Sequence, residues 1–260
     1  MIGIPRQLLA EILAFTIAFP TCAIGSNANG NTTASNVLGY VYDFENRLVR
    51  QGGITIVYDG DGNRVSKTVA GVTTTYLVDD QNPTGYAQAI YESNSQTGAM
   101  AQYAYGLELV GRSDMSTGAL LYYVHDGHGS VRALTDNTGA VTGTYDYDAF
   151  GNLIHSTGTT PNNYLFAGEQ YDPDLHLYYN RARYLNTSTG RFWSLDSYEG
   201  DNNDPLSLHK YAYTDGDPTN SRDRSGNEID ELIGALSMSM TRAAVPTLCD
   251  GPRRKMEKRR

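Results

Sequence analysis

The sequence predicts an all-β fold built from antiparallel β-hairpin repeats, and three observations support this prediction. Aromatic residues followed by aspartate recur at the ends of apolar runs, as in Tyr42-Asp43 and Tyr58-Asp59. The chain has 27 glycines and 20 tyrosines but only 6 phenylalanines, which suits strands whose rings keep a hydrogen-bonded tip. Residues 163–226 show no sustained 3.6-residue period, so this part of the chain is not predicted to be helical.

The aromatic-Asp units are typical of hairpin turns, and two more begin at His125-Asp126 and Tyr147-Asp148. In each unit a strand ends at the aromatic residue, aspartate accepts backbone N–H groups, and a Gly or Asn takes positive φ before the next strand. One unit can bury its apolar face only by stacking on its neighbours, so the repeats predict a continuous strip of sheet. We expect strands near 38–42, 54–58, 64–69, 72–78, 87–91, 100–105, 120–124, 131–134 and 143–147, with hairpin tips at 93–98 and 136–139.

Residues 164–226 are predicted to close one end of this strip. Short aromatic runs alternate there with Asp, Asn, Gly and Pro, and the only tryptophan, Trp193, lies among them. Such alternation is typical of short strands joined by tight turns.

The order of residues in this segment also resembles a known family. The strings LYYNRARYLNTSTGRFWSLD and LHKYAYTDGDPTNSRDRSG resemble the RHS repeat-associated core, the closing segment of the Tyr-Asp (YD) repeat shell proteins. This family includes bacterial polymorphic toxins, the C component of toxin complexes, wall-associated proteins and teneurins. The resemblance covers residues 26–227, which divide into hairpin repeats at 26–124 and the core at 125–227.

The resemblance implies the main functional hypothesis, a non-enzymatic structural module. In the family, such strips spiral into a hollow shell that encloses a C-terminal polypeptide, often a toxin. This chain has too few repeats for a complete shell, and a strip with open edges predicts self-association or a protein partner. The 34 residues from Asn227 to Arg260 are too few for a folded toxin domain, so an enclosed polypeptide is expected to be encoded elsewhere.

The two ends of the chain differ from its body. Residues 1–25 combine Arg6 with a short apolar stretch and small residues near Ala23, the pattern of a secretory signal, although Glu11 interrupts it. They are either a signal peptide of a secreted or cell-surface protein, or a mis-started leader of a cytoplasmic one. Residues 228–245 have apolar residues at helical spacing and predict a short amphipathic helix. Residues 246–260 form a basic tail that is predicted to be disordered.

The charge distribution argues against nucleic acid as a partner of the body. The net charge is −9, but the last eight residues alone carry +5, so the other 252 residues carry −14. An acidic body repels the phosphate backbone.

A pair of carboxylates is the candidate catalytic site. In toxin-bearing members of the family, two DPxG motifs bring two aspartates together for self-cleavage, and the resemblance places Asp196 and Asp223 on these positions, with the cut near Asn227. Two adjacent carboxylates share a proton, so one acts as an acid while the other activates water.

Several residues depart from the family pattern at this site. Ser197 and Arg224 stand in place of the two prolines, Gly200 lies one place too far, and Leu195 replaces a basic residue. Arg224 is also expected to depress the pKa of the neighbouring carboxylate, which would oppose a shared proton. The alternative is that both aspartates cap turns.

No cofactor or metal site is predicted. The DGDGN string at 59–63 lacks the Gly and Glu of a calcium loop, which would fall on Arg64 and Ala70. His125, Asp126 and His128 have no third His or Cys nearby to complete a zinc site. No phosphate loop, serine nucleophile elbow or CxxC pair is present.

The aromatic residues offer a third hypothesis, an extracellular surface that binds glycans or proteins. Exposed Tyr and Trp on a sheet can stack on sugars. The alternative is that these rings pack across strands inside the sheet, where each pair contributes about 0.2–1 kcal/mol.

Overall fold

The computed structural model describes residues 24–35, 38–227 and 229–231 of the 260-residue chain. In these ranges the protein is almost entirely β-structure, with two short 3-10 turns and no helix long and apolar enough to cross a membrane. The predicted fold class is therefore confirmed. The predicted basic tail and residues 1–23 of the predicted leader lie outside the described residues, whereas Ile24 and Gly25, the last two residues assigned to the leader, lie in the first strand of the sheet.

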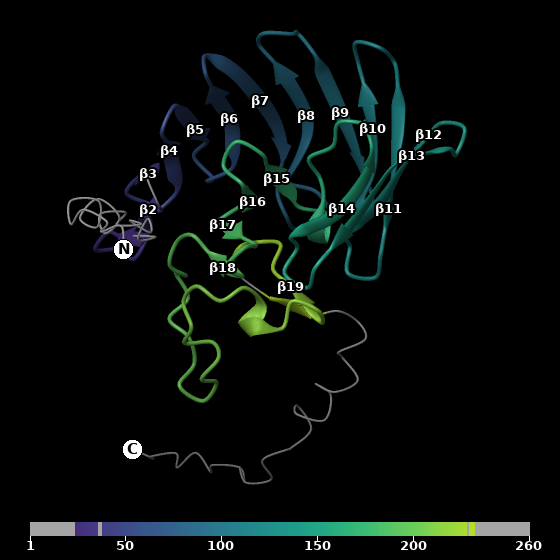
Figure 1. Ribbon diagram of the computed structural model, residues 1–260. Helices are drawn as coiled ribbons and strands as arrows, with labels where there is room; N and C mark the ends of the chain where they lie inside the picture. Colours follow the sequence, from purple (N-terminus) through teal and green to yellow (C-terminus); the bar gives the residue numbers. More distant parts are fainter. Residues whose placement is uncertain (1–23, 36–37, 228, 232–260) are drawn as a thin grey trace, which may run out of the picture.

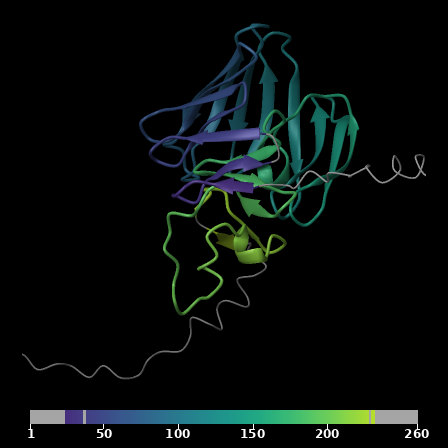
Figure 2. The same cartoon turned by 60° about the vertical axis from the view of Figure 1, so that its left-hand side comes forward.

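The larger part of the protein is a 14-stranded antiparallel sheet whose strands follow one another in chain order. It curves strongly, as Figures 1 and 2 show. Its strands are β1 (Ile24–Ser26), β2 (Thr32–Ser35), β3 (Leu38–Tyr42), β4 (Leu48–Gln51), β5 (Ile54–Tyr58), β6 (Arg64–Val69), β7 (Val72–Asp79), β8 (Gln88–Asn94), β9 (Met100–Tyr105), β10 (Leu109–Asp114), β11 (Leu120–His125), β12 (Val131–Asp136), β13 (Val141–Tyr147) and β14 (Leu153–Gly158).

The aromatic-Asp units form hairpin turns, as predicted. In all four units the aspartate Oδ1 accepts the N–H groups of the second and fourth following residues at 2.8–3.0 Å. The third following residue has positive φ in every case, and it is glycine in three units and Asn46 in the first. This arrangement satisfies the turn amides that the strands cannot pair.

A second part of the chain, which we call the inner segment (residues 159–227), lies against the concave side of this sheet (Figures 1 and 2). It contains a four-stranded antiparallel sheet, two 3-10 turns and one strand of a two-stranded ladder. Its elements are η1 (Phe166–Gly168), β15 (Gln170–Asp172), β16 (Leu177–Asn180), β17 (Arg183–Asn186), β18 (Arg191–Phe192), η2 (Thr214–Gly216) and β19 (Ser221–Arg222), which pairs with β20 (Asp230–Glu231).

Two hydrophobic clusters join the sheet to the inner segment. One places Tyr40, Leu48 and Ile56 of the sheet against Leu177, Tyr184 and Trp193. The other places residues of β9–β13 against the region from Tyr164 to Tyr213. Each strand turns alternate residues inward, so Ile56 is buried whereas its neighbour Val57 is 53% exposed on the outer face.

A buried ion cluster also holds the two parts together. The Arg64 guanidinium lies 3.2 Å from Asp172 and between the rings of Tyr76 and Tyr179. Lys67, three residues further along β6, lies 2.8 Å from the same carboxylate. These charges pair across the interface between the large sheet and the inner segment.

Two sequence predictions need correction or refinement. The helix predicted over 228–245 is wrong at Asp230–Glu231, which form β20 because they pair with Ser221–Arg222; the remainder lies outside the described residues. The division at 124/125 separates motifs but not structural units, since the large sheet runs unbroken through β14. Strands β1, β2, β4, β10 and β14 of the large sheet were not predicted as strands.

Candidate functional site: an aspartate pair on one arginine

The structure brings Asp196 and Asp223 together around a single side chain, Arg183. Arg183 is the first residue of β17, Asp196 lies in the loop after β18, and Asp223 follows β19. The Arg183 Nη2 atom lies 2.6 Å from Asp196 Oδ2 and 3.5 Å from Asp223 Oδ2. The two carboxylates therefore approach one nitrogen from two loops that are far apart in sequence.

The site is largely withdrawn from solvent. The side chains of Arg183 and Asp223 are 4% and 2% exposed, while Asp196 is 17% exposed and forms the solvent side of the pair. The Arg183 guanidinium also stacks 3.8 Å from the centre of the Phe192 ring. Phe192 belongs to the main hydrophobic cluster, so the core fixes the position of Arg183.

Burial shifts the pKa values of Asp223 and Arg183 in opposite directions. Burial raises the pKa of Asp223 to about 6, although Arg183 opposes this shift. Burial lowers the pKa of Arg183, and the two carboxylates oppose that shift. The prediction that a neighbouring arginine depresses the pKa of Asp223 is therefore wrong, because desolvation of the carboxylate outweighs the effect of the Arg183 cation. The arginine on both carboxylates is Arg183, whereas the Arg224 guanidinium lies over the Tyr86 ring.

Each aspartate also caps a turn, as the alternative interpretation proposed. Asp196 Oδ1 accepts the N–H of Tyr198 at 2.8 Å. Asp223 Oδ1 accepts the N–H of Gly226 at 2.7 Å and the Ser225 hydroxyl at 3.2 Å. In both residues one oxygen serves the turn and the other faces Arg183, so turn capping and pairing occur together.

Asn227, the predicted cleavage residue, lies close to this pair. The Arg183 Nε–H donates to the carbonyl oxygen of Gly226, directly before Asn227. Asn227 and Asp196 both line a cavity of about 530 Å³ that also reaches the hairpin tips at Arg47 and Gly62. The sequence thus identified three residues that the fold brings to one place.

Sequence reasoning missed Arg183 as the centre of the site. The only available signal was its place in the RARY string next to tyrosines, which does not reveal partners that lie in other loops.

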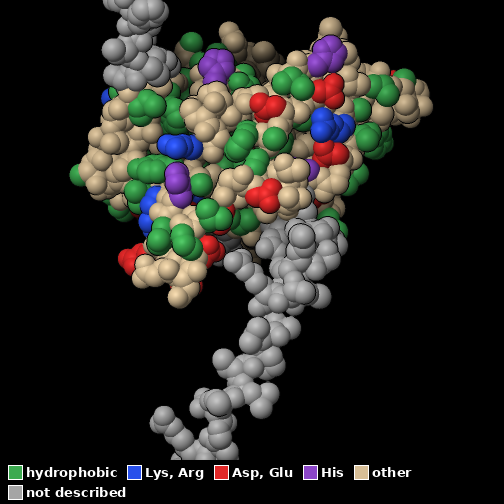
Figure 3. Space-filling view, turned by 60° about the horizontal axis from the view of Figure 1, so that its bottom comes forward, with side chains coloured by type: hydrophobic (Ala, Val, Ile, Leu, Met, Phe, Trp, Pro, Cys, Tyr) green, Lys and Arg blue, Asp and Glu red, His purple; other side chains and the backbone are tan. Residues whose placement is uncertain are grey.

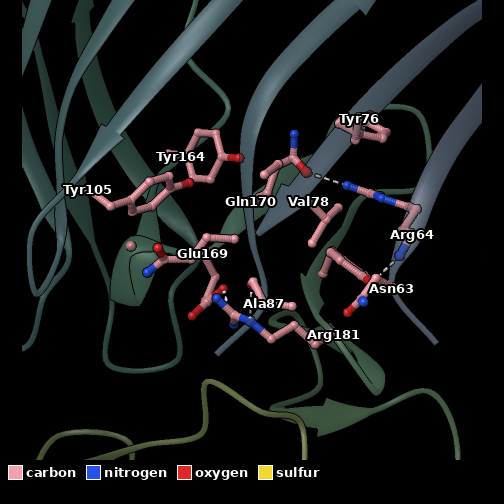
Figure 4. A pocket seen from close by; sticks show the side chains of 14 residues that line it. Asn63, Arg64, Tyr76, Val78, Ala87, Tyr105, Tyr164, Glu169, Gln170 and Arg181 are labelled. Carbon is pink, nitrogen blue, oxygen red and sulfur yellow. Dashed lines mark hydrogen bonds and ion pairs between the residues drawn. The ribbon is translucent and has the colours of Figure 1, made fainter. Parts of the chain in front are cut away.

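A second polar cavity, of about 50 Å³, lies between the large sheet and the inner segment (Figure 4). Arg64 and Gln170 point toward each other there, and Arg181 pairs with Glu169 at 2.8 Å. Burial raises the pKa of Glu169, and Arg181 opposes this shift. These groups satisfy one another, which indicates a structural role in joining the two parts.

The histidines singled out in the sequence have structural partners. Both ring nitrogens of His125 face carbonyl oxygens, Gly129 at 2.9 Å and Leu109 at 2.8 Å. His128 stacks on Phe166, with ring centres 5.0 Å apart. Asp126 pairs with Arg132 at 2.7 Å. Among the described residues, no group of three or more His, Cys, Asp or Glu side chains could hold a metal ion.

Charged side chains are interspersed on the face shown in Figure 3. Basic and acidic groups alternate there with apolar patches, and the coloured atoms form no continuous basic surface.

The fold and this site define a class: a strip of YD-type hairpins that curves around its own closing segment, with two aspartates near the end of that segment. The teneurin YD-shell family model matches residues 26–219, and the chain belongs to this family. Its relatives and structural neighbours agree with this membership.

The curated relatives are much longer than this chain. The tRNA(Glu)-specific nuclease WapA of Bacillus subtilis subsp. natto is 32% identical over 223 residues, covering 82% of this chain and 9% of that protein. The tRNA nuclease WapA of Bacillus subtilis strain 168 has the same identity and coverage. This chain therefore spans less than a tenth of the length of these relatives.

The structural neighbours are toxin-complex proteins. A chain of the Photorhabdus luminescens Tc holotoxin pore superposes with a TM-score of 0.63 at 17% identity, covering 79% of this chain and 11% of that one. A chain of the TcdB2-TccC3-Cdc42 crystal structure gives 0.62 at 18% identity, covering 78% and 11%. At this identity the likeness shows the fold alone.

Proposed function

We propose that this chain is the closing end of a YD-repeat shell, a non-enzymatic module that takes part in enclosing a polypeptide. The observation that carries this proposal is the seating of the inner segment on the concave side of the sheet. Two hydrophobic clusters and the buried cluster of Arg64, Lys67 and Asp172 hold it there. A segment held in this way packs against the concave side of the strip and closes one of its ends.

The partner of such a module is proposed to pair with the open edges of the large sheet. Among the described strands, β1 and β14 each pair with one neighbour. All six residues of β14 are exposed, including Ile154 at 67%. An unpaired edge of this kind accepts a strand from another chain, and a second copy is the simplest candidate.

Light scattering coupled to size exclusion tests this association. The wild-type chain should elute with a mass above the 28.5 kDa of one copy, and Ile154→Lys should shift it toward one copy. Leu107→Lys is the control, because Leu107 is 80% exposed in the loop between β9 and β10. A wild-type chain that stays a single copy at every concentration would contradict edge pairing.

A second function, self-cleavage near Asn227, is supported by the pairing of Asp196 and Asp223 on Arg183. In this reaction one carboxylate takes a proton from a water molecule, and the oxygen of that water attacks the carbonyl carbon of the peptide bond. The other carboxyl donates its proton to the leaving nitrogen as the C–N bond breaks. The raised pKa of Asp223 suits it to the role of proton donor.

Intact mass of the purified chain tests self-cleavage. A fragment ending near Asn227 should appear in the wild type and disappear in Asp223→Asn. Asp217→Asn is the matched control, since Asp217 caps an exposed turn at Asn220. A wild-type chain that remains full length across the acidic range rules the reaction out.

The structure also bears on the hypothesis of a glycan-binding surface. All 20 tyrosines lie in the described residues, and among them Tyr122 and Tyr198 are exposed, so packing of the rings inside the sheet is favoured over a glycan-binding surface.

Secretion or display at the cell surface is proposed on the signal-like pattern of residues 1–25 alone.

A further inference from the structure

Four successive residues of the β16–β17 turn hold four successive carbonyl groups of the segment that ends at Gly226. The Asn180 Nδ2 donates to Asp223 O at 2.5 Å, and the Ala182 N–H donates to Ser225 O at 3.1 Å. The Arg181 Nη1 and the Arg183 Nε donate to Arg224 O and Gly226 O. Residues 180, 181, 182 and 183 thus bind residues 223, 224, 225 and 226 in the same order.

Gly226 fits this arrangement because it has no side chain. A Cβ atom at Gly226 would lie 2.2 Å from Asn180 O and 2.9 Å from Arg183 N, both of them backbone atoms. Its φ of +80° is also a conformation that other residues rarely adopt. The fourth position of the bound segment therefore accepts glycine alone.

The four hydrogen bonds from residues 180–183 recognise the main chain of the bound segment. In all four hydrogen bonds the acceptor is a backbone carbonyl, which every residue type offers. The Asp223 carboxylate adds a bond to the Gly226 N–H, which closes the bound turn. The preferred ligand is thus a four-residue peptide with aspartate first and glycine fourth.

We propose that the Asn180–Arg183 turn is a peptide-binding cradle that selects residues 223–226 and presents the chain beyond Gly226 to Asp196. The presenting role rests on the self-cleavage proposed above, whereas the binding role does not. Arg183 joins the two roles, because its Nε binds the Gly226 carbonyl and its Nη2 lies on both carboxylates. After hydrolysis the cradle keeps the new C-terminal end bound, so each molecule reacts once.

Amide hydrogen exchange and intact mass of two glycine variants test this proposal in the full chain. In Gly226→Ala the added methyl should expel the segment, so the Ala182 N–H should exchange about tenfold faster or more, and any self-cleavage should fall by a similar factor. Gly216→Ala is the matched control: its φ is +85°, yet nothing lies within 4 Å of an added Cβ. It should leave both readouts near wild type.

Asn180→Asp is the second variant if Gly226→Ala does not fold. It keeps the volume of the side chain but replaces the Nδ2 donor to Asp223 O with an oxygen, so the same amide should lose protection.

The outcomes separate the two proposals. Faster exchange at Ala182 in an otherwise folded Gly226→Ala or Asn180→Asp, without cleavage of the wild type, supports the cradle and contradicts self-cleavage. An Ala182 amide that exchanges at the wild-type rate in these variants overturns the cradle, whether or not the wild type is cleaved.

Discussion

At the scale of single residues, Arg183 lies at the centre of the candidate site. It has contacts with Asp196, Asp223 and the Gly226 carbonyl, and it is buried against Phe192. Desolvation nevertheless dominates the Asp223 carboxyl and raises its pKa to about 6. The pair is therefore asymmetric, with a buried carboxyl that takes up a proton in mildly acidic solution and a more exposed one on the arginine.

Replacing Asp223 with Asn should change how stability depends on pH. Because the pKa of Asp223 is raised from 3.8 to about 6, the folded state binds this proton more tightly than the unfolded state. The resulting stability is fully present below 3.8 and is lost as the pH rises through about 6, a change of about 3 kcal/mol. The unfolding free energy of the wild type minus that of Asp223→Asn should therefore fall across this range in urea titrations.

Glu169, whose pKa is also raised, contributes equally to both proteins and cancels in this difference. A difference that stays constant, or that grows as the pH rises, would show that Asp223 does not titrate as a buried carboxyl.

Arg64 is predicted to be among the most sensitive single positions. Arg64→Met leaves the buried Asp172 carboxylate with Lys67 alone, and loss of one partner from a buried ion pair costs about 3–5 kcal/mol. Chemical unfolding measures this loss directly. Arg50→Met, on exposed β4 surface, is the control and should change stability by about 0.5 kcal/mol or less. Equal effects of the two substitutions would contradict the buried cluster.

At the scale of elements, strands and turns follow from local chemistry. Strands β3, β5, β6 and β9 were predicted with their observed bounds, because aromatic-Asp turns or Gly tips delimit them and β-branched or aromatic residues fill them. Strands β1, β2, β4, β10 and β14 were missed. In the last three, LVRQ, LVGRSD and LIHSTG carry charged, Gly or polar residues that weaken the alternation. These segments become strands because neighbouring strands pair with them.

The candidate site shows where sequence reasoning stops. The family motif pointed to Asp196, Asp223 and Asn227, and the fold brings these residues together. The role of Arg183 could not be predicted, because its partners lie on two separate loops. Likewise, helical spacing after Gly226 could not reveal that Asp230–Glu231 pair with β19.

Two neighbouring residues of β5 test which face of the sheet is covered. Ile56→Ala should cost about 2–5 kcal/mol, because Ile56 is 3% exposed and packs against the inner segment. Val57→Ala should cost about 0.5 kcal/mol or less, because Val57 points to the outer face. Urea unfolding of both variants provides the measurement, and a larger cost at Val57 would mean that the opposite face is buried.

At the scale of the whole molecule, the protein is a curved strip of sheet folded around its own closing segment. The sheet supplies the curved strip, and the inner segment supplies the closure through two cores and a buried ion cluster. The chain covers 9% of the length of its WapA relatives. The open edges of the large sheet are where a second copy is proposed to join.

The fluorescence of Trp193 tests the central claim most directly. This only tryptophan is 6% exposed and packs on Tyr40 of the sheet, with ring centres 5.8 Å apart, so it reports on the seating of the inner segment. In the native chain it should be shielded from acrylamide, and urea should expose it in the same transition that removes the β-sheet circular dichroism. A tryptophan open to acrylamide in the native chain, or exposed in an earlier separate transition, would contradict an inner segment that is an integral part of the fold.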